Sequence, residues 1–182
     1  TRKVSFIANP IQRMNKSPFI WKTFIKLSEQ AEKSIVVQSP YIVPTKEMEQ
    51  YIDKSVKSKV QRIILTNSIT STTNAMAFSA YLGVKNRVIK AASKLYEYQQ
   101  PYSIHGKSVV YDQRLSAVGS FNLDSRSVFL NTESMVMIDS EEFAAELTGA
   151  IENKISHSTL VGNEGEPVDF NTDSQKNAPP VK

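Results

Sequence analysis

The segment IHGKSVVYDQRLSAVGSFNLDSRS, residues 104–127, is the most informative part of this sequence and contains its reactive side chains. Two runs of β-branched and other apolar residues flank Asp112-Gln113-Arg114, and this pattern predicts a β-hairpin that turns at those three residues. His105 and Lys107 are two residues apart, so on a strand their side chains lie on the same face. The first arm of the hairpin is therefore expected to present an imidazole beside an ammonium group.

The returning arm carries a second pair of polar side chains at the same spacing. Ser120 and Asn122 are also two residues apart. With the turn centred on Gln113, this pair lies diagonally beside His105 and Lys107. Imidazole, ammonium, amide and hydroxyl groups are thus expected to converge on one patch.

This combination of groups suits a phosphate. Lysine offers a fixed positive charge to a phosphate oxygen, and asparagine offers two N–H donors. A neutral imidazole can attack phosphorus or exchange protons near neutral pH. Gly119 lets a ligand or another backbone approach closely, so it is a candidate for substrate binding. Glu133, on the next predicted strand, is expected to accept a hydrogen bond from the other ring nitrogen of His105 and so to select its tautomer.

The motif H-x-K-x(4)-D-x(6)-G-S-x-N specifies six residues over the 18 positions of residues 105–122. In this motif the chain resembles the phospholipase D superfamily, whose motif is called HKD. The continuation NLDSRSVFLNTE and the upstream segments IVVQSPYIVP, RIILTNS and KLYEYQ are similar to the branch that contains bacterial cardiolipin synthases. The resemblance extends over residues 1–155 and is greatest to the carboxy-terminal half of a member with two such motifs.

The resemblance implies a role for each residue of the motif. It implies that His105 is one of two active-site histidines in a reaction that proceeds through a phosphohistidine. It also implies that Lys107 and Asn122 bind the phosphoryl oxygens with help from Ser120, and that Glu133 orients His105. No metal and no cofactor is required by this chemistry.

Other residues are candidates for structural or binding roles. Asp112 is the aspartate of the motif, but it falls at the hairpin turn. It is therefore expected to have a structural role and not to contact the substrate. Arg126 is expected to support the loop after the motif or to meet a lipid headgroup. Tyr81 is a candidate for substrate binding, because it lies near a loop that should face the motif. The same reasoning adds three residues to the lining of a cleft, namely Tyr41, Asn67 and Ser68.

The second histidine of the chain does not complete the site. His157 lies far along the chain from the hairpin and has no lysine two residues later, so we interpret it as a solvent-exposed side chain. The mechanism implied by the resemblance uses one imidazole as nucleophile and another as general acid and base. The second imidazole would come from another HKD half of the same parent chain or from a homodimer partner that repeats the motif about a twofold axis. In the first arrangement, the resemblance makes His105 the general acid and base.

Three functions remain open at this point. The first is phosphodiester cleavage or phosphatidyl transfer on a phospholipid of the phosphatidylglycerol type, with this chain supplying one half-site. The second is a single-motif homodimeric nuclease, and the third is an isolated half that is inactive by itself. The D-x-R-S extension after the motif favours the first function. The excess of Lys and Arg over Asp and Glu in residues 1–138 also suits a nucleic acid.

Charge distribution, cysteine content and hydropathy limit the kinds of protein to which this chain can belong. Residues 1–138 carry 19 Lys and Arg against 9 Asp and Glu, whereas residues 139–182 carry 3 against 9. The chain has no cysteine, which excludes disulfides and thiolate chemistry. It begins with Thr, and no apolar run reaches transmembrane length. We therefore expect a piece of a longer protein. The resemblance implies that this protein is bacterial and peripheral to the membrane through parts outside this chain.

The order of predicted elements indicates the fold class. Strands and helices alternate up to about residue 92, and several strands and a last helix follow. This order predicts an α/β sandwich with a mixed, largely parallel central sheet. The resemblance implies that it is a phospholipase D-like α/β/α sandwich. We expect one catalytic domain over residues 1–156 and a polar, disordered tail or linker over residues 157–182.

Overall fold

The computed structural model describes residues 3–11, 16–48, 59–163 and 165–168. In chain order its elements are β1 (Lys3–Ala8), α1 (Phe19–Gln30), β2 (Ser34–Gln38), β3 (Ile42–Val43), β4 (Gln61–Asn67), α3 (Ala75–Ala91), β5 (Lys94–Tyr98), β6 (Ser108–Tyr111), β7 (Leu115–Gly119), β8 (Leu123–Asp124), α4 (Ser125–Phe129), β9 (Ser134–Asp139), α5 (Glu141–Ile155), β10 (Ser158–Val161) and β11 (Pro167–Val168). The helix expected after Thr45 falls largely on residues 49–58, which lie outside the described residues.

One nine-stranded sheet organises the domain, in the order β1-β9-β7-β6-β2-β4-β5-β10-β11. Parallel pairing joins β2 to β4 and β4 to β5. The other neighbouring strands of this sheet are antiparallel. The expected mixed sheet is confirmed, and its parallel pairing lies at the centre, where α3 forms the crossover from β4 to β5.

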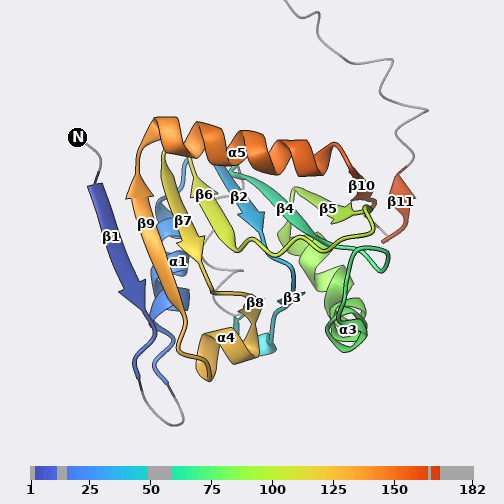
Figure 1. Ribbon diagram of the computed structural model, residues 1–182, viewed down its shortest axis with the longest axis horizontal. Helices are drawn as coiled ribbons and strands as arrows, with labels where there is room; N and C mark the ends of the chain where they lie inside the picture. Colours follow the sequence, from blue (N-terminus) through green and yellow to red (C-terminus); the bar gives the residue numbers. More distant parts are fainter. Residues whose placement is uncertain (1–2, 12–15, 49–58, 164, 169–182) are drawn as a thin grey trace, which may run out of the picture.

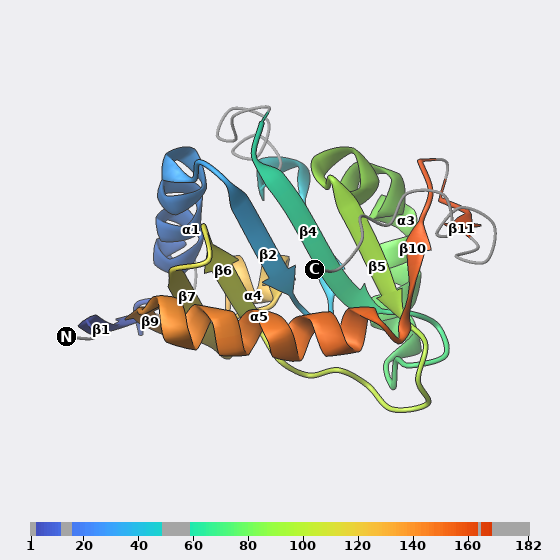
Figure 2. The same cartoon turned by 90° about the horizontal axis from the view of Figure 1, so that it is seen from above.

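The sheet lies between two layers of helices, as Figures 1 and 2 show. Alternation along β2 sends Ile35 to a core shared with α1 and sends Val36 to a core shared with α5. Helix α3 packs against Leu95 of β5 in a third cluster. The α/β/α sandwich expected from the sequence is thus confirmed.

The chain continues in the sheet beyond residue 156. Strand β10 pairs antiparallel with β5, and β11 pairs with β10. Val161 is buried against α3, and Leu160 packs against the α5 core, so both side chains hold β10 on the edge that β5 would otherwise expose. The expectation of a tail from residue 157 is therefore wrong for β10 and β11, and residues 169–182 lie outside the described residues.

Among the described helices, none is both long and apolar enough to cross a membrane.

The predicted hairpin is present as β6 and β7. Residue 108 pairs with residue 118, and the Gly119 N–H donates to the Lys107 carbonyl over 3.1 Å, which is the register expected from the sequence. The backbone turns through Asp112 and Gln113, with φ angles of 51° and 57°. Two consecutive left-handed residues match the right-handed twist of the two arms.

The Asp112 carboxylate ties this turn to the start of β2. It accepts hydrogen bonds from the backbone N–H groups of Glu32 at 2.9 Å, Lys33 at 2.7 Å and Ser34 at 2.9 Å. Burial by itself would raise the pKa of this carboxyl, but the three backbone donors and the Lys33 charge outweigh it and lower the pKa below the ordinary 3.8. This geometry supports a structural role for Asp112.

Replacing Asp112 with asparagine is expected to destabilise the fold by about 1–2 kcal/mol at pH 7, because an amide turns N–H donors toward backbone N–H groups. A carboxyl whose pKa is lowered on folding stabilises the protein above its unfolded pKa and loses that contribution as the pH falls through the folded pKa. The difference in the free energy of unfolding between wild type and Asp112→Asn should therefore be largest at neutral pH and should decrease below about pH 4. Urea unfolding at pH 7 and pH 3 measures it, and an equal difference at both pH values would contradict the assignment.

Candidate active site

His105 and Lys107 lie side by side just before β6. The Lys107 Nζ donates to the His105 carbonyl oxygen at 2.7 Å and lies 3.1 Å from Nδ1 and 3.2 Å from Nε2 of the ring. The imidazole is exposed to solvent, whereas Lys107 is only 7% exposed. The structure thus brings together the two groups that the motif predicted, with the ring at the surface and the ammonium behind it.

Burial changes the electrostatics of Lys107. It disfavours the charged ammonium and lowers the pKa of Lys107 below 10.5, although the negative charges of Glu133 and Asp124 oppose this change. An ammonium group that has lost part of its hydration has more to gain from an anionic ligand than an exposed one. Lys107 is therefore well suited to bind a phosphate oxygen.

The Glu133 carboxylate accepts hydrogen bonds from three neighbouring side chains. The donors are the hydroxyl of Ser120, the hydroxyl of Ser127 at 2.9 Å and the Asn131 amide at 3.0 Å. The structure does not show the expected hydrogen bond between Glu133 and His105. Side chains from α4 and the following loop occupy the carboxylate instead, so Glu133 holds the second arm of the site together.

Asn122 sits at the edge of this network. Its backbone N–H donates to the Ser127 hydroxyl at 3.2 Å, and its side-chain oxygen is buried without a hydrogen-bond partner. Asp124 caps α4 by accepting from the Ser127 N–H at 2.8 Å. Ser127 and Asn131 both lie within the motif continuation, but residue spacing gave no signal that they would converge on Glu133.

Strand β9 passes so close to position 119 that only glycine fits there. A Cβ atom at this position would lie 2.1 Å from the Ser134 carbonyl oxygen and 2.8 Å from the Met135 Cα. The close approach expected at Gly119 is therefore that of the β9 backbone. The structure gives no support to the prediction that Gly119 binds substrate.

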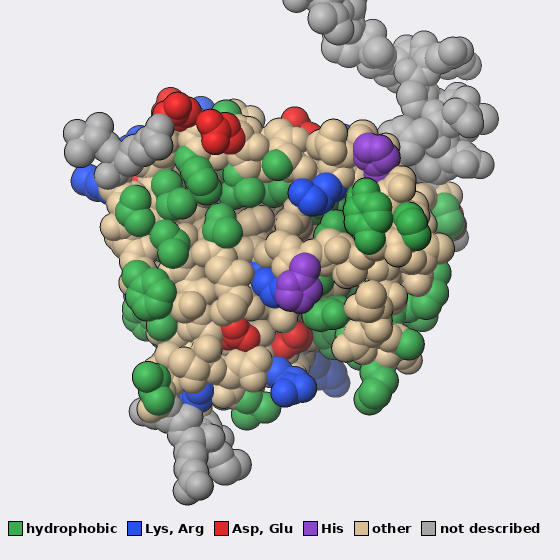
Figure 3. Space-filling view, in the orientation of Figure 1, with side chains coloured by type: hydrophobic (Ala, Val, Ile, Leu, Met, Phe, Trp, Pro, Cys, Tyr) green, Lys and Arg blue, Asp and Glu red, His purple; other side chains and the backbone are tan. Residues whose placement is uncertain are grey.

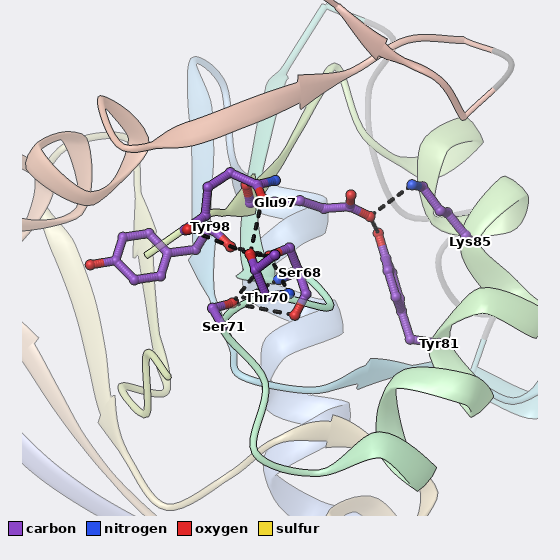
Figure 4. Close-up of polar contacts among 8 residues, drawn as sticks. Ser68, Thr70, Ser71, Tyr81, Lys85, Glu97 and Tyr98 are labelled. Carbon is purple, nitrogen blue, oxygen red and sulfur yellow. Dashed lines mark hydrogen bonds and ion pairs between the residues drawn. The ribbon is translucent and has the colours of Figure 1, made fainter. Parts of the chain in front are cut away.

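The Tyr81 hydroxyl is used in a contact with Glu97 of β5. Tyr81 is 3% exposed, and its hydroxyl donates to Glu97 at 2.8 Å, where the Lys85 ammonium also binds at 2.8 Å (Figure 4). Burial, and next the Glu97 charge, raise the pKa of this phenol far above its ordinary value. The predicted role of Tyr81 in substrate binding thus has no geometric support.

The remaining candidates take different positions. Asn67 and Ser68 are buried, and the Ser68 hydroxyl donates to the Tyr98 carbonyl. The Arg126 side chain is exposed, and its carbonyl accepts the Asn131 N–H at 2.7 Å, which supports the loop after the motif. His157 is exposed beyond α5, as expected, with its Nδ1 2.8 Å from the Asn153 carbonyl oxygen.

The fold is an α/β/α domain in which an exposed imidazole lies beside a buried ammonium group, a pair of side chains that is chemically suited to a phosphate. Residues 24–155 match the family model described as "Cardiolipin synthase, PLD-like domain". The chain belongs to the phospholipase D superfamily.

Relatives and solved structures agree with this assignment. The chain is 31% identical over 134 residues to the minor cardiolipin synthase ClsB of Bacillus subtilis, an alignment that covers 72% of this chain and 32% of that protein. It superposes on the phospholipase D family member Nuc from Salmonella typhimurium with a TM-score of 0.67 and 16% identity, covering 88% of this chain and 98% of Nuc. For the phosphatidylserine synthase of Haemophilus influenzae, the TM-score is 0.71 at 15% identity, and the coverage is 96% of this chain and 43% of the synthase. The two structures at this identity show the fold alone.

The chain spans about a quarter to a third of the length of the curated relatives that it matches, with shares of 27%, 32% and 26% among them. These relatives are bacterial proteins, and several are named as cardiolipin synthases, which are enzymes.

Proposed function

We propose that this chain supplies one half-site of an enzyme that cleaves phosphodiesters or transfers phosphatidyl groups on phospholipid. The observation that carries the proposal is the exposed His105 ring held beside the buried Lys107 ammonium, in a member of the phospholipase D superfamily. Lys107 and the Asn122 amide would bind phosphoryl oxygens. Glu133 would hold Ser120 in place and balance the lysine charge.

The reaction would proceed in two displacements. One imidazole attacks phosphorus while the bond from phosphorus to the leaving oxygen breaks, and a second imidazole protonates that oxygen. The second imidazole then takes the proton of an incoming alcohol or water, whose oxygen attacks phosphorus and releases the first histidine. The nucleophilic imidazole is bonded to phosphorus in the intermediate, so a separate group must carry the proton, and in this scheme that group is the histidine of a partner half.

A face of the sheet beside the site suits a partner half. The register of β1, β9 and β7 puts five apolar side chains on one face, and Val4 and Phe6 are 63% and 69% exposed there. The other three are the half-buried Val118, Val136 and Ile138. Figure 3 shows hydrophobic side chains gathered over these strands and a histidine near the middle of the same face. A second HKD half, from the same parent protein or a second copy, would cover this apolar face and bring its own histidine to the site.

The relatives named as cardiolipin synthases favour phospholipid as the substrate, with phosphatidylglycerol the expected type. A phospholipid substrate places the working enzyme at a membrane surface. The second candidate is a homodimeric nuclease, which is favoured by the 19 basic against 9 acidic residues of residues 1–138. Turnover of phosphatidylglycerol in mixed micelles and of single-stranded DNA, measured on the same preparation, discriminates between the two functions.

Replacing Lys107 with methionine is expected to weaken binding of inorganic vanadate or phosphate about tenfold or more, because the charge that meets the anion is lost while the apolar stem remains. Titration calorimetry on the chain measures the affinity. Lys22→Met is the matched control, since Lys22 is exposed on α1. Equal affinities of wild type and Lys107→Met would refute the phosphate-binding role.

A further inference from the structure

We infer that Asn67 is a positioning residue for His105, a role that rests on the proposed function of that histidine. Asn67 is the last residue of β4, far in sequence from the motif, and it is 2% exposed. Its side chain reaches the backbone of Ile104, the residue immediately before His105.

The Asn67 amide pairs with Ile104 as a neighbouring strand would. Its oxygen accepts the Ile104 N–H at 2.9 Å, and its nitrogen donates to the Ile104 carbonyl at 3.1 Å. The same nitrogen lies 2.8 Å from the Ser103 hydroxyl and 3.3 Å from the Pro40 carbonyl. One buried side chain thus holds both backbone groups of the residue that precedes the reactive imidazole.

This contact matters because the segment that carries His105 is not part of a strand. Residues 99–107 connect β5 to β6, and their backbone is tied to the sheet at Gln99, which donates to the His157 carbonyl, and at Lys107, which accepts from Gly119. Between these two ties, the Asn67 amide and the buried Ile104 side chain fix the path of the chain.

A hydroxyl-rich loop holds the Asn67 side chain in turn. Ser71 donates to the Asn67 oxygen at 3.2 Å, and Ser71 also accepts the Ser68 N–H at 2.9 Å. Figure 4 shows Ser68, Thr70 and Ser71 gathered at one point, beside the backbone of Tyr98. The loop after β4 therefore adds a second donor to the Asn67 oxygen that accepts the Ile104 N–H.

The ring of His105 depends on this backbone anchor. Its hydrogen bonds in the described structure are with Lys107, and the ring is exposed, so packing does not fix its place. A shift of about 1 Å in a reacting group can cost about a hundredfold in rate. Loosening Ile104 should therefore affect the chemical step more than substrate binding.

The first test uses NMR on the 182-residue chain, whose two histidines give two Cε1–H signals. Asn67→Asp keeps the shape and one acceptor but turns an oxygen toward the Ile104 carbonyl. We expect the His105 signal to move and broaden and the His157 signal to stay. Asn74→Asp is the matched control, because Asn74 caps α3 through its oxygen and aspartate caps equally well, so neither signal should move. Circular dichroism confirms that each chain is folded.

A second variant covers the case in which Asn67→Asp does not fold. Ser103 is half-buried and accepts from Asn67 while donating to the Ile104 carbonyl at 3.0 Å, so Ser103→Ala removes part of the same anchor with little loss of packing. An unchanged His105 signal in a folded Asn67→Asp chain, or in Ser103→Ala if the first does not fold, overturns the positioning role.

Turnover separates this inference from the proposed function. With phosphatidylglycerol in mixed micelles and an assembly that carries both half-sites, Asn67→Asp should lower kcat about 10–100-fold and leave KM within about threefold. Wild-type kcat in Asn67→Asp, where His105→Ala is inactive, would overturn the positioning role alone. Full activity in His105→Ala would instead overturn the proposed function, on which the role of Asn67 rests.

Discussion

Replacing His105 with alanine is expected to lower phosphodiester turnover by about a thousandfold or more, because a displacement at phosphorus that lacks one of its two imidazoles loses either the nucleophile or the proton-transfer group. The fold should be unaffected, since the ring is exposed and its hydrogen bonds are with Lys107 alone among the described contacts. The measurement is kcat on phosphatidylglycerol in an assembly with two half-sites, together with the thermal midpoint of the chain.

His157→Ala is the control for this result, because that histidine is exposed beyond α5 and bonds to the Asn153 carbonyl. Its turnover should equal that of wild type. Light scattering on the same samples shows how the second imidazole is supplied. An active dimer of this chain would favour the nuclease-like arrangement, and an inactive monomer would favour a partner half from a longer protein. Turnover that survives in His105→Ala is incompatible with the mechanism.

Replacing Gly119 with alanine is expected to destabilise the domain by about 3 kcal/mol, because the new Cβ would overlap backbone atoms that cannot rotate away. The nearest is the Ser134 carbonyl oxygen at 2.1 Å, followed by the Met135 sulfur at 2.7 Å and its Cα at 2.8 Å. Strands β7 and β9 would have to separate at the end that carries Ser120 and Glu133. Urea unfolding followed by circular dichroism measures the loss.

Gly149→Ala is the control, and it is expected to change the free energy of unfolding in the opposite direction in the same assay. Gly149 is exposed on α5, and a Cβ there meets no atom within 4 Å, so alanine should stabilise the helix by about 0.5–1 kcal/mol. If Gly119→Ala were as stable as Gly149→Ala, β9 could not be as close to β7 as the structure places it.

The hairpin could be predicted from the sequence because its determinants are local. The turn at Asp112 and Gln113, and the register that places residue 107 opposite residue 119, follow from the two-residue periodicity of its arms. The pairing of His105 with Lys107 follows from their nearness in sequence, although both residues lie just before β6 and not on the strand that their spacing predicts. The sandwich could be predicted because the order of strands and helices leaves few ways to bury their apolar faces.

The partners of Glu133 and Tyr81 could not be predicted in this way. Glu133 takes hydrogen bonds from side chains that α4 and its loop bring to it, and the packing of α3 on β5 sends the Tyr81 hydroxyl to Glu97. Strand β10 was missed because its short apolar run lies in a polar segment and forms a strand only where the edge of β5 is available.

The hairpin, the proximity of His105 to Lys107 and membership in the phospholipase D superfamily can all be inferred from residues 104–127, because each depends on spacing within one short segment. The contacts that hold this segment in place come from residues far away in the sequence. Asn67 comes 37 residues before Ile104 and meets it because β4 ends where the chain enters the site. Contacts of this kind depend on how strands are ordered in the sheet, and strand order follows from the packing of the whole core.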